Sequence, residues 1–558
     1  MASVSKSNIN QKIVVFGVPL VSVLVWTKTT LDPVNLPKMV LLSAVGFSLV
    51  TFVTRELWRK GSRRLNVYVI LNLLYLIWIL LATFFSGTNP IQSFFGVNGR
   101  HTGTLTYISF TILALAIFLQ PILNFYKKII FGLSATGIVN ILYCGFVILT
   151  NKDPIPWVNV YGNILGTFGN PNFVSSFLGI FIISSFALIL ARLREPKILA
   201  PMGLLCLIAF TEILDSQSRQ GVLVTLLGCS ALVVYKIYNS RVAVIFKVSV
   251  LIGFLVSGVL AILGMLQIGP LESIIYKTSV SIRGAYWRAG WETMLQNPIF
   301  GVGPDGFGDW YARTRDARAM IVPGQDVFTN SPHNVFIEQG ANGGIVLFII
   351  YLLTQLFIFF CGIRFIIRNK SFDFVFAASF FAWLGFTAQS LISINQIGLA
   401  IWGYVLGAVS VGVCVGSANQ SEEKQILSTK VSRKNIERFD FSNHLAGAGA
   451  ALGLILALPI FSAEASWRSA TESKNLERII VAADNWPQST DRYTSGIKAL
   501  YASKFESQAL TLTRKGIKFN SNVARLWYFL YQFPGSTDEE KRMAVENLKK
   551  LDPNFIVK

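Results

Sequence analysis

The sequence offers few side chains that titrate near neutral pH, and one of them stands at an unusual position. Only three histidines occur among the 558 residues, and His333 lies in "NSPHNVFIEQGANGG", where a polar segment becomes an apolar helix. A neutral imidazole can orient or deprotonate a hydroxyl group. A histidine at a helix start is often only a cap or packing residue. Here the polar neighbours and the following glycines, which allow close backbone approach, favour a functional His333.

Arginines collect in similar polar segments. Arg219 lies in "DSQSRQGVL", and Arg100 precedes His101 in "VNGRHTG". The polar segment 267–342 adds Arg283, Arg288, Arg313, Arg315 and Arg318. A guanidinium group makes paired hydrogen bonds to phosphate and suits a partly dry site. These residues therefore predict a binding site for an anionic group.

Each arginine also has a structural explanation. Arg219 could satisfy helix-end carbonyls or pair with Asp215, four residues earlier. Arg100 could contact a loop or lipid headgroups. The cluster 313–318 contains Asp316 and could form the solvated face of a helix.

Two other kinds of site are disfavoured. "GVGPDG" (301–306) matches the glycine pattern of dinucleotide-binding loops, but it follows an amphipathic helix pattern instead of a strand. A tight turn is therefore the better interpretation. The sequence contains no HExxH motif, no phosphate-binding Walker loop and no carboxylate-rich cluster, so we predict no metal and no cofactor.

The elements that carry these residues follow from the composition. The chain is 53% hydrophobic and only 14% charged, and apolar runs of membrane-spanning length recur along it. We predict an all-α polytopic membrane protein with about 12–14 transmembrane helices. The thirteen expected spans are 12–28, 36–53, 65–85, 104–120, 128–149, 173–191, 198–214, 221–238, 242–266, 343–361, 372–391, 395–416 and 445–463. The first is expected to be a retained helix rather than a cleaved signal peptide.

The basic residues predict how these spans are oriented. Alternate links contain 20 lysines and arginines, whereas the opposite short links contain only Lys28, Arg100, Lys152 and Arg219. The positive-inside rule then places the N-terminus in the cytoplasm. This distribution also explains the net charge of +20 without a nucleic-acid partner. The five cysteines fall in apolar runs, so no disulfide is expected.

Two polar regions are too long to be turns, and both are expected outside the cytoplasm. Residues 267–342 form a large outer loop within a transmembrane domain of residues 1–463. Residues 464–558 form a helical tail that ends in "LDPN". Helix pairs of this kind resemble tetratricopeptide units, which usually bind other proteins, so the tail predicts a possible protein partner.

Four stretches together resemble the O-antigen ligase and polymerase superfamily of bacterial membrane glycosyltransferases. They are "GTFGNPNFVSSFLG" (166–179), "SRQGVL" (218–223), "RGAYWRAGWETMLQNPIFGVGPDGF" (283–307) and "HNVFIEQGANGGIVLFIIYLL" (333–353). Their order and spacing agree with the family, and the resemblance covers residues 36–416. The soluble tail and its extra span depart from the simplest ligases.

The resemblance implies transfer of a glycan from an undecaprenyl-diphosphate carrier to a glycan, lipid or protein acceptor. The fold that it implies is a helical membrane bundle with a large periplasmic loop. By this likeness Arg219 and Arg283 match the family's functional arginines, and His333 matches its histidine.

The residues and the resemblance together predict a metal-independent, inverting transfer at the outer face of the cytoplasmic membrane. Arg219 and Arg283 would hold the diphosphate, while His333 would orient or deprotonate the acceptor hydroxyl. Further candidates for substrate binding are Arg288, Arg100, Asn334, Arg313 and Arg315. Ligase and polymerase activities stay open.

Two alternatives belong to other classes of protein. A transporter or flippase of lipid-linked glycans would place ionisable groups near the bilayer midplane, whereas these charges gather at one face. A scaffold for envelope assembly would not need thirteen spans.

Overall fold

The computed structural model describes residues 9–58, 66–275, 278–426 and 442–554. Within these ranges the chain is all-helical, with 76% of residues in helices and no strand. The helices are α1 (Ile9–Val23), α2 (Asn35–Ser48), α3 (Val50–Trp58), α4 (Val67–Phe85), α5 (Pro90–Phe95), α6 (Thr104–Phe118), α7 (Leu123–Thr150), η1 (Gly166–Phe168), α8 (Pro171–Ala191), α9 (Pro196–Asp215), α10 (Arg219–Tyr238), α11 (Val244–Met265), α12 (Glu272–Ile275), α13 (Thr278–Gln296), α14 (Phe307–Thr314), η2 (Ala317–Met320), α15 (Val335–Arg368), α16 (Phe374–Ser390), α17 (Ile397–Ile426), α18 (Ser442–Ser473), α19 (Leu476–Asp484), α20 (Thr490–Ala502), α21 (Glu506–Phe519), α22 (Ala524–Gln532) and α23 (Asp538–Leu551).

The chain is a multi-pass membrane protein, as predicted. Ten helical segments of the described chain are long and apolar enough to cross a bilayer. Three shorter apolar helices, α1, α6 and α16, accompany them. Each of the thirteen predicted spans falls on one of these thirteen segments. The apolar runs therefore located the helices correctly, although α1, α6 and α16 are shorter than the roughly 20 residues that a span normally needs.

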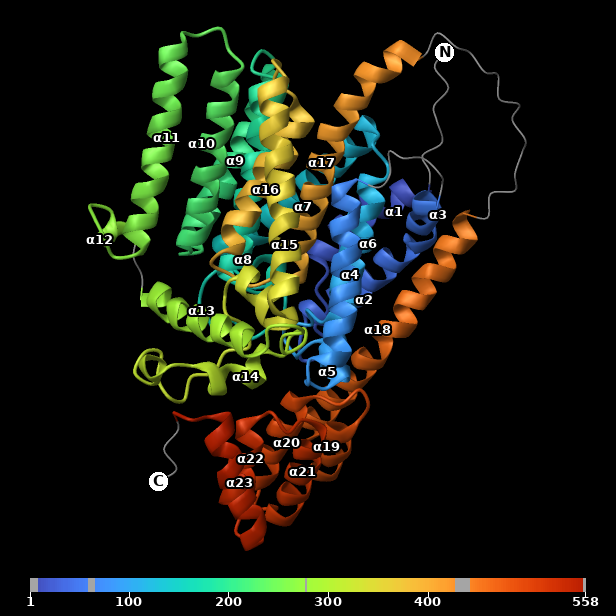
Figure 1. Cartoon of the computed structure of the whole chain (residues 1–558), viewed down its shortest axis with the longest axis vertical. Helices are drawn as coiled ribbons and strands as arrows, with labels where there is room; N and C mark the ends of the chain where they lie inside the picture. The colour runs from blue at the N-terminus through green and yellow to red at the C-terminus, as the bar shows by residue number, and fades with distance from the viewer. Residues whose placement is uncertain (1–8, 59–65, 276–277, 427–441, 555–558) are drawn as a thin grey trace.

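Small residues let the central helices pack closely. The helices α6, α8, α16 and α17 bury most of their surface in one hydrophobic core. A Cβ atom added at Gly403 of α17 would lie 2.1 Å from the Phe386 ring of α16, and one at Gly362 of α15 would lie 2.1 Å from Phe380. Glycine at these helix contacts is typical of membrane bundles. By contrast, α11 stands at the edge of the bundle (Figure 1) and buries almost nothing within the described chain.

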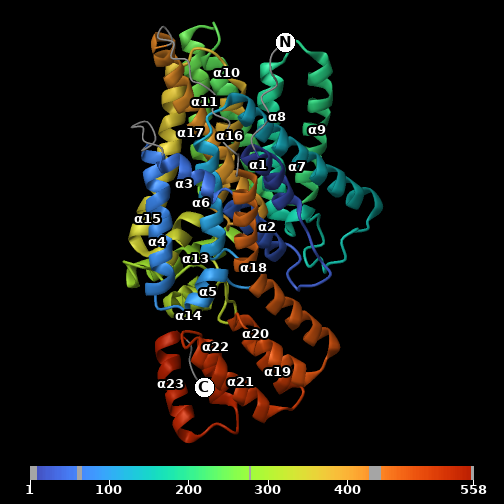
Figure 2. The ribbon, with the colours of Figure 1, turned by 90° about the vertical axis from the view of Figure 1, so that its right-hand side faces the viewer.

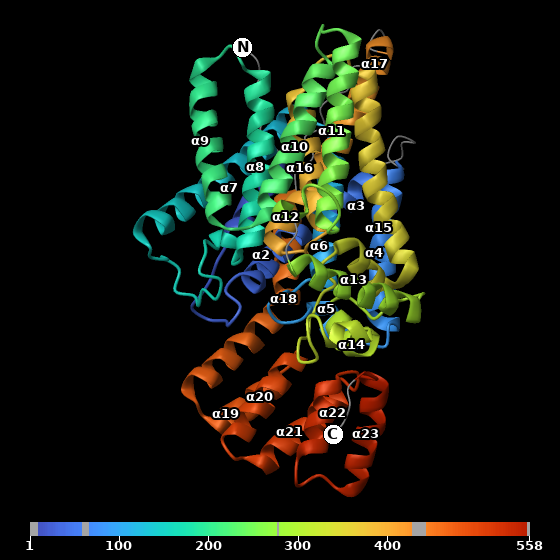
Figure 3. The same ribbon diagram turned by 90° about the vertical axis from the view of Figure 1, so that its left-hand side faces the viewer.

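The polar segment after α11 lies across one end of the bundle. Helices α13 and α14 run between the membrane helices and the C-terminal helices (Figure 1). The α8–α9 and α10–α11 links lie at the opposite end (Figures 1 and 3). We call the end that carries α13 and α14 the tail end of the bundle.

The C-terminal helices form a separate layer beyond the tail end (Figure 2). Helix α18 is continuous from Ser442 to Ser473, so the predicted boundary at residue 464 falls inside a helix. Helices α20 and α21 pack against each other, as do α22 and α23, around their own hydrophobic core. A buried ion pair between Arg492 and Glu464 (3.3 Å) joins α20 to α18. The helix pairs agree with the predicted helical tail, and their assignment as tetratricopeptide units stays a prediction.

Candidate functional site

His333 occupies a strained position directly before α15. Its φ of +54° lies in the left-handed region, which non-glycine residues adopt at a cost. Three contacts hold it there. The Ser331 hydroxyl oxygen accepts its backbone N–H (3.1 Å), the Trp287 indole donates to its carbonyl (3.3 Å), and the Tyr286 ring stacks on the imidazole at 5.6 Å. No described side chain forms a hydrogen bond with the imidazole, so both ring nitrogens are free to meet a substrate.

Helix α13 presents Arg283 on the face that contacts His333. Tyr286 and Trp287 follow Arg283 by three and four residues, a spacing that places all three side chains on one side of a helix. Burial and, to a smaller extent, the nearby charges of Arg283 and Arg100 together lower the pKa of His333 from 6.5 to about 4. The imidazole is therefore neutral at physiological pH. The structure thus brings two of the predicted catalytic residues together.

Arg283 carries a positive charge that nothing in the described chain neutralises. Its side chain is partly buried, and this burial lowers the pKa of the guanidinium below its usual value. Among the described residues, none donates to, accepts from or forms an ion pair with its guanidinium group. A partly desolvated cation without a partner favours binding of an external anion.

Glycines allow the backbone of the segment before α14 to pack closely against the backbone of α15. Gly301 and Gly303 have φ values of +61° and +85°, and the Val302 and Gly303 N–H groups donate to α15 carbonyls at 2.8 and 3.0 Å. Helix α15 breaks at Gly344, with φ +71°, and the next N–H donates to the Pro298 carbonyl. A Cβ atom at Gly301 would lie 2.4 Å from a backbone oxygen. The predicted tight turn and close approach of the backbones are therefore confirmed.

Arg100 lies in a buried charge cluster beside this turn. Its guanidinium forms an ion pair with Glu338 and lies 3.6 Å from Asp305, and all three side chains are at most 3% exposed. Burial opposes the charge, but the two carboxylates raise the pKa of Arg100 above its usual value. Asp305 also accepts hydrogen bonds from the Thr102 N–H (2.9 Å) and hydroxyl (2.6 Å). This cluster ties the segments around residues 100, 305 and 338 together; a substrate-binding role for Arg100 stays a prediction.

Sequence reasoning missed both carboxylates of this cluster. Neither Asp305 nor Glu338 was singled out as a site residue from the sequence. A glutamate one turn inside an apolar helix, five residues after His333, was the available signal.

The remaining predicted binding residues have different surroundings. Asn334 caps α15, since its side chain accepts from the N–H groups of Phe336 (3.0 Å) and Ile337 (3.2 Å). Arg288 forms a half-exposed ion pair with Asp316 at 2.8 Å. Substrate binding by both stays a prediction.

Arg313 and Arg315 both reach toward the tail. Arg313 stacks on Trp310 at 3.8 Å and contacts Asn522. Arg315 is fully buried; it pairs with Asp552 at 2.7 Å and donates to the Gln325 carbonyl. The terminal "LDPN" thus contacts the outer loop. Substrate binding by these two arginines likewise stays a prediction.

Arg288 and Arg313 line an open groove next to α13. The groove has a volume of about 700 Å³, and Trp287, Trp291 and Asp316 also line it. Indole rings beside guanidinium groups are suited to a sugar carrying an anionic group.

Arg219 begins α10 and is exposed. The preceding Ser218 hydroxyl donates to the Asn172 side chain at 2.9 Å, and a Cβ atom at Gly221 would lie 2.6 Å from Ser175. The stretches 166–179 and 218–223 therefore contact each other. The N-terminal end of α10 reaches the same end of the bundle as α13 (Figure 1).

No cluster of three or more metal-ligating side chains occurs among the described residues. All five cysteines are free thiols.

Residues 203–352 match a family model described as O-antigen ligase. The matched segment contains Arg219, α13, the glycine turn and His333. No curated protein matches the chain.

Proposed function

We propose, on the premise that residues 203–352 belong to the O-antigen ligase family, that this chain transfers a glycan from an undecaprenyl-diphosphate carrier to an acceptor hydroxyl. The family match supports glycan transfer in cell-envelope biosynthesis. The finer proposal is carried by one observation: the Arg283 guanidinium has no ion-pair partner among the described residues and lies near a neutral His333 imidazole, which forms no hydrogen bond with them.

In the proposed reaction the acceptor oxygen attacks the anomeric carbon and inverts it. The bond between that carbon and the diphosphate oxygen breaks, and its electron pair leaves on the diphosphate. Arg283 and Arg219 stabilise the growing negative charge, as fixed cations do in a site with little water. Arginine side chains supply this charge without a metal ion.

His333 receives the proton of the acceptor hydroxyl in this scheme. Its lowered pKa keeps the imidazole neutral, so one ring nitrogen is always available as an acceptor. The low pKa also makes His333 a weak base, so most of the proton moves only once the carbon–oxygen bond is forming. The groove beside α13 holds the carrier-linked sugar through Arg288 and Arg313.

The proposed location is the outer face of the cytoplasmic membrane. The α8–α9 and α10–α11 links, which carry five of the twenty basic residues of the predicted cytoplasmic set, lie opposite the tail end. By the positive-inside rule the tail end, with α13 and His333, then lies outside.

Alanine substitutions test this function directly. His333→Ala and Arg283→Ala should each lower glycan transfer by about 100-fold or more in cells, the effect of removing one charge-stabilising contact or the base. Arg318→Ala serves as the matched control, because that arginine is exposed in the same outer loop. Immunoblots of membrane fractions would verify abundance. Normal transfer by both variants would refute the proposal.

The product in a deletion strain distinguishes the two enzyme types. A ligase is indicated where carrier-linked polymer persists and surface attachment is lost, a polymerase where single repeat units accumulate. Loss of carrier-linked glycan from the outer face would instead indicate a transporter.

A further inference from the structure

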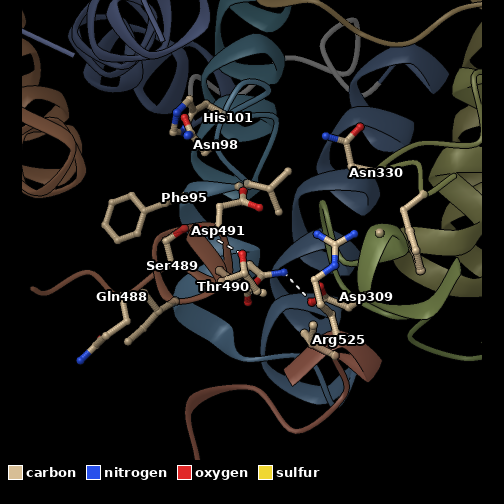
Figure 4. Close-up of a pocket in the computed structure, with 18 of the residues that line it drawn as sticks. Phe95, Asn98, His101, Asp309, Asn330, Gln488, Ser489, Thr490, Asp491 and Arg525 are labelled. Atoms are coloured by element: carbon tan, nitrogen blue, oxygen red, sulfur yellow. Dashed lines mark hydrogen bonds between the residues drawn. The ribbon is translucent and has the colours of Figure 1, made fainter. Parts of the chain in front are cut away.

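A cavity lies between the tail and the membrane domain, apart from the groove beside α13 (Figure 4). Its volume is about 420 Å³. Four parts of the chain line it: the segment 91–101, the outer loop around Asp309 and Asn330, α18 at Glu464, and the tail around Asp491 and Arg525. We call this cavity the tail chamber.

A hydrogen-bond network fixes the tail to the membrane domain at the wall of the chamber. The Gln92 side chain donates to Asp309 (2.7 Å) and accepts from the Thr490 hydroxyl (2.8 Å). Asn520 donates to the same Asp309 carboxylate at 2.7 Å. The chamber is therefore a built feature with defined walls, because both layers supply the bonds that close it.

Several buried polar atoms that face the chamber have no partner in the described chain. Both ring nitrogens of His101 lack a hydrogen bond although its side chain is 1% exposed, and its nearest charged atom, on Asp32, is 3.8 Å away. One carboxylate oxygen of Glu464, also 1% exposed, and the Asn98 side-chain oxygen are unpartnered as well. Buried polar groups normally have hydrogen-bond partners, so these atoms indicate a ligand that supplies them.

The chemistry of these atoms favours a ligand rich in hydroxyl groups. The Asn98 and Glu464 oxygens are acceptors, and the two ring nitrogens of His101 can exchange hydrogen bonds with hydroxyl groups. Phe95 and Phe328 add apolar surface to the wall. Sugar hydroxyls donate and accept, and the C–H faces of a sugar ring pack on aromatic rings.

The charges of the chamber disfavour the diphosphate carrier. Asp309, Glu464 and Asp491 face Arg525 and His101 across the cavity. Burial raises the pKa of Asp309 to about 6, but a carboxylate there still repels an anion at neutral pH. The groove beside α13, by contrast, is lined by Arg288 and Arg313, which favour an anionic ligand. The chamber therefore suits a neutral ligand and the groove an anionic one.

The chamber and the candidate catalytic residues share structural segments. The Arg100 guanidinium donates to the carbonyl of Asn330 (2.7 Å), which itself lines the chamber, and His101 follows Arg100 directly. Three residues after Asn330 comes His333. A ligand in the chamber thus lies against the same segment that positions the imidazole.

We propose that the tail chamber is the acceptor subsite and binds a neutral, hydroxyl-rich saccharide, with Asn98, His101 and Glu464 as its hydrogen-bonding residues. This inference rests on the proposed function, because it assigns the second substrate of the same transfer. The tail is then a wall of the acceptor site.

Cysteine labelling tests the chamber in the full-length protein. Ser489 lines the cavity, and its side chain makes no hydrogen bond within the described chain, so Ser489→Cys leaves the network intact. Alkylating this cysteine with a bulky maleimide in membranes should stop transfer. Ser507→Cys, on the exposed face of α21, provides the control and should leave transfer unchanged after equal labelling.

Protection identifies the ligand class. Delipidated surface polysaccharide from the same cells should slow labelling of Ser489→Cys but not of Ser507→Cys, whereas undecaprenyl diphosphate should not. Asn98→Leu should raise the acceptor concentration for half-maximal transfer about tenfold, as expected for the loss of one hydrogen bond. The donor concentration for half-maximal transfer should stay unchanged.

The outcomes separate this inference from the proposed function. Transfer that is unchanged after full labelling of Ser489→Cys, while His333→Ala is inactive, overturns the assignment of the chamber as the acceptor subsite. The proposed glycosyltransferase function then still stands. Protection by undecaprenyl diphosphate assigns the chamber to the donor and overturns the inference. Normal transfer by both His333→Ala and Arg283→Ala refutes the proposed function itself.

Discussion

Arginines at the tail end of the bundle fall into two settings that differ in their partners. Arg100 and Arg315 are buried and paired with carboxylates of Glu338 and Asp552. Arg283 is partly buried, and the described chain gives it no acidic partner. A paired arginine has its charge satisfied by the fold, whereas an unpaired one keeps its charge for a ligand. We therefore predict that Arg283, rather than the buried and paired Arg100 and Arg315, contacts substrate.

The largest expected effect on stability comes from breaking the Arg100 cluster. Arg100→Ala leaves the Glu338 and Asp305 carboxylates buried without their cation, at a cost of about 3–5 kcal/mol. We expect a clearly lower Tm in detergent, measured by thermal unfolding. The double variant Arg100→Met/Glu338→Gln removes both charges of the closest pair and should recover most of the loss. If the single variant Arg100→Ala kept normal stability but lost transfer, the result would instead indicate that Arg100 binds substrate.

Some features of the fold and the site could be predicted from the sequence, and others could not. Among the described residues, apolar runs located the ten helices that are long enough to cross a bilayer and the three shorter apolar helices, since length and hydropathy suffice for that. The glycine patterns correctly predicted the turn at 301–306 and the close approach to α15. Pairing could not be predicted, because Arg100, Glu338 and Asp305 are separated by as many as 238 positions along the chain. The contact between Arg315 and the terminal "LDPN" could not be predicted for the same reason.

A smaller effect is expected in the pH dependence of transfer. His333 should stay neutral until the pH approaches about 4, because burial and the two arginines lower its pKa. The protonated fraction, and with it the loss of activity, should therefore be slight between pH 7 and 5.5, whereas a histidine of pKa 6.5 would change from mostly neutral to mostly charged over the same range. Initial rates of transfer in membranes across this range would measure it. A decline centred near pH 6.5 would contradict the burial of His333.

The smallest effect is expected at the half-exposed pair of Arg288 and Asp316. Such pairs contribute about 0.2–1 kcal/mol, so Asp316→Asn should barely change Tm. Freed from its partner, Arg288 would become a cation without a carboxylate partner in the groove. The donor concentration for half-maximal transfer should then fall or stay constant. A rise would place the pair among the structural arginines and shift donor recognition toward Arg313.

Helix α18 fixes the distance between the membrane domain and the tail. It leaves the membrane domain and runs to Ser473 without a break, so the residues beyond 463 add about 15 Å at 1.5 Å per residue. Glu464 lies on α18 and forms an ion pair with Arg492 of α20. The distance between the tail and the membrane is therefore set by a helix and not by a flexible linker. An acceptor bound in the proposed tail chamber would therefore meet walls that are held at a fixed separation.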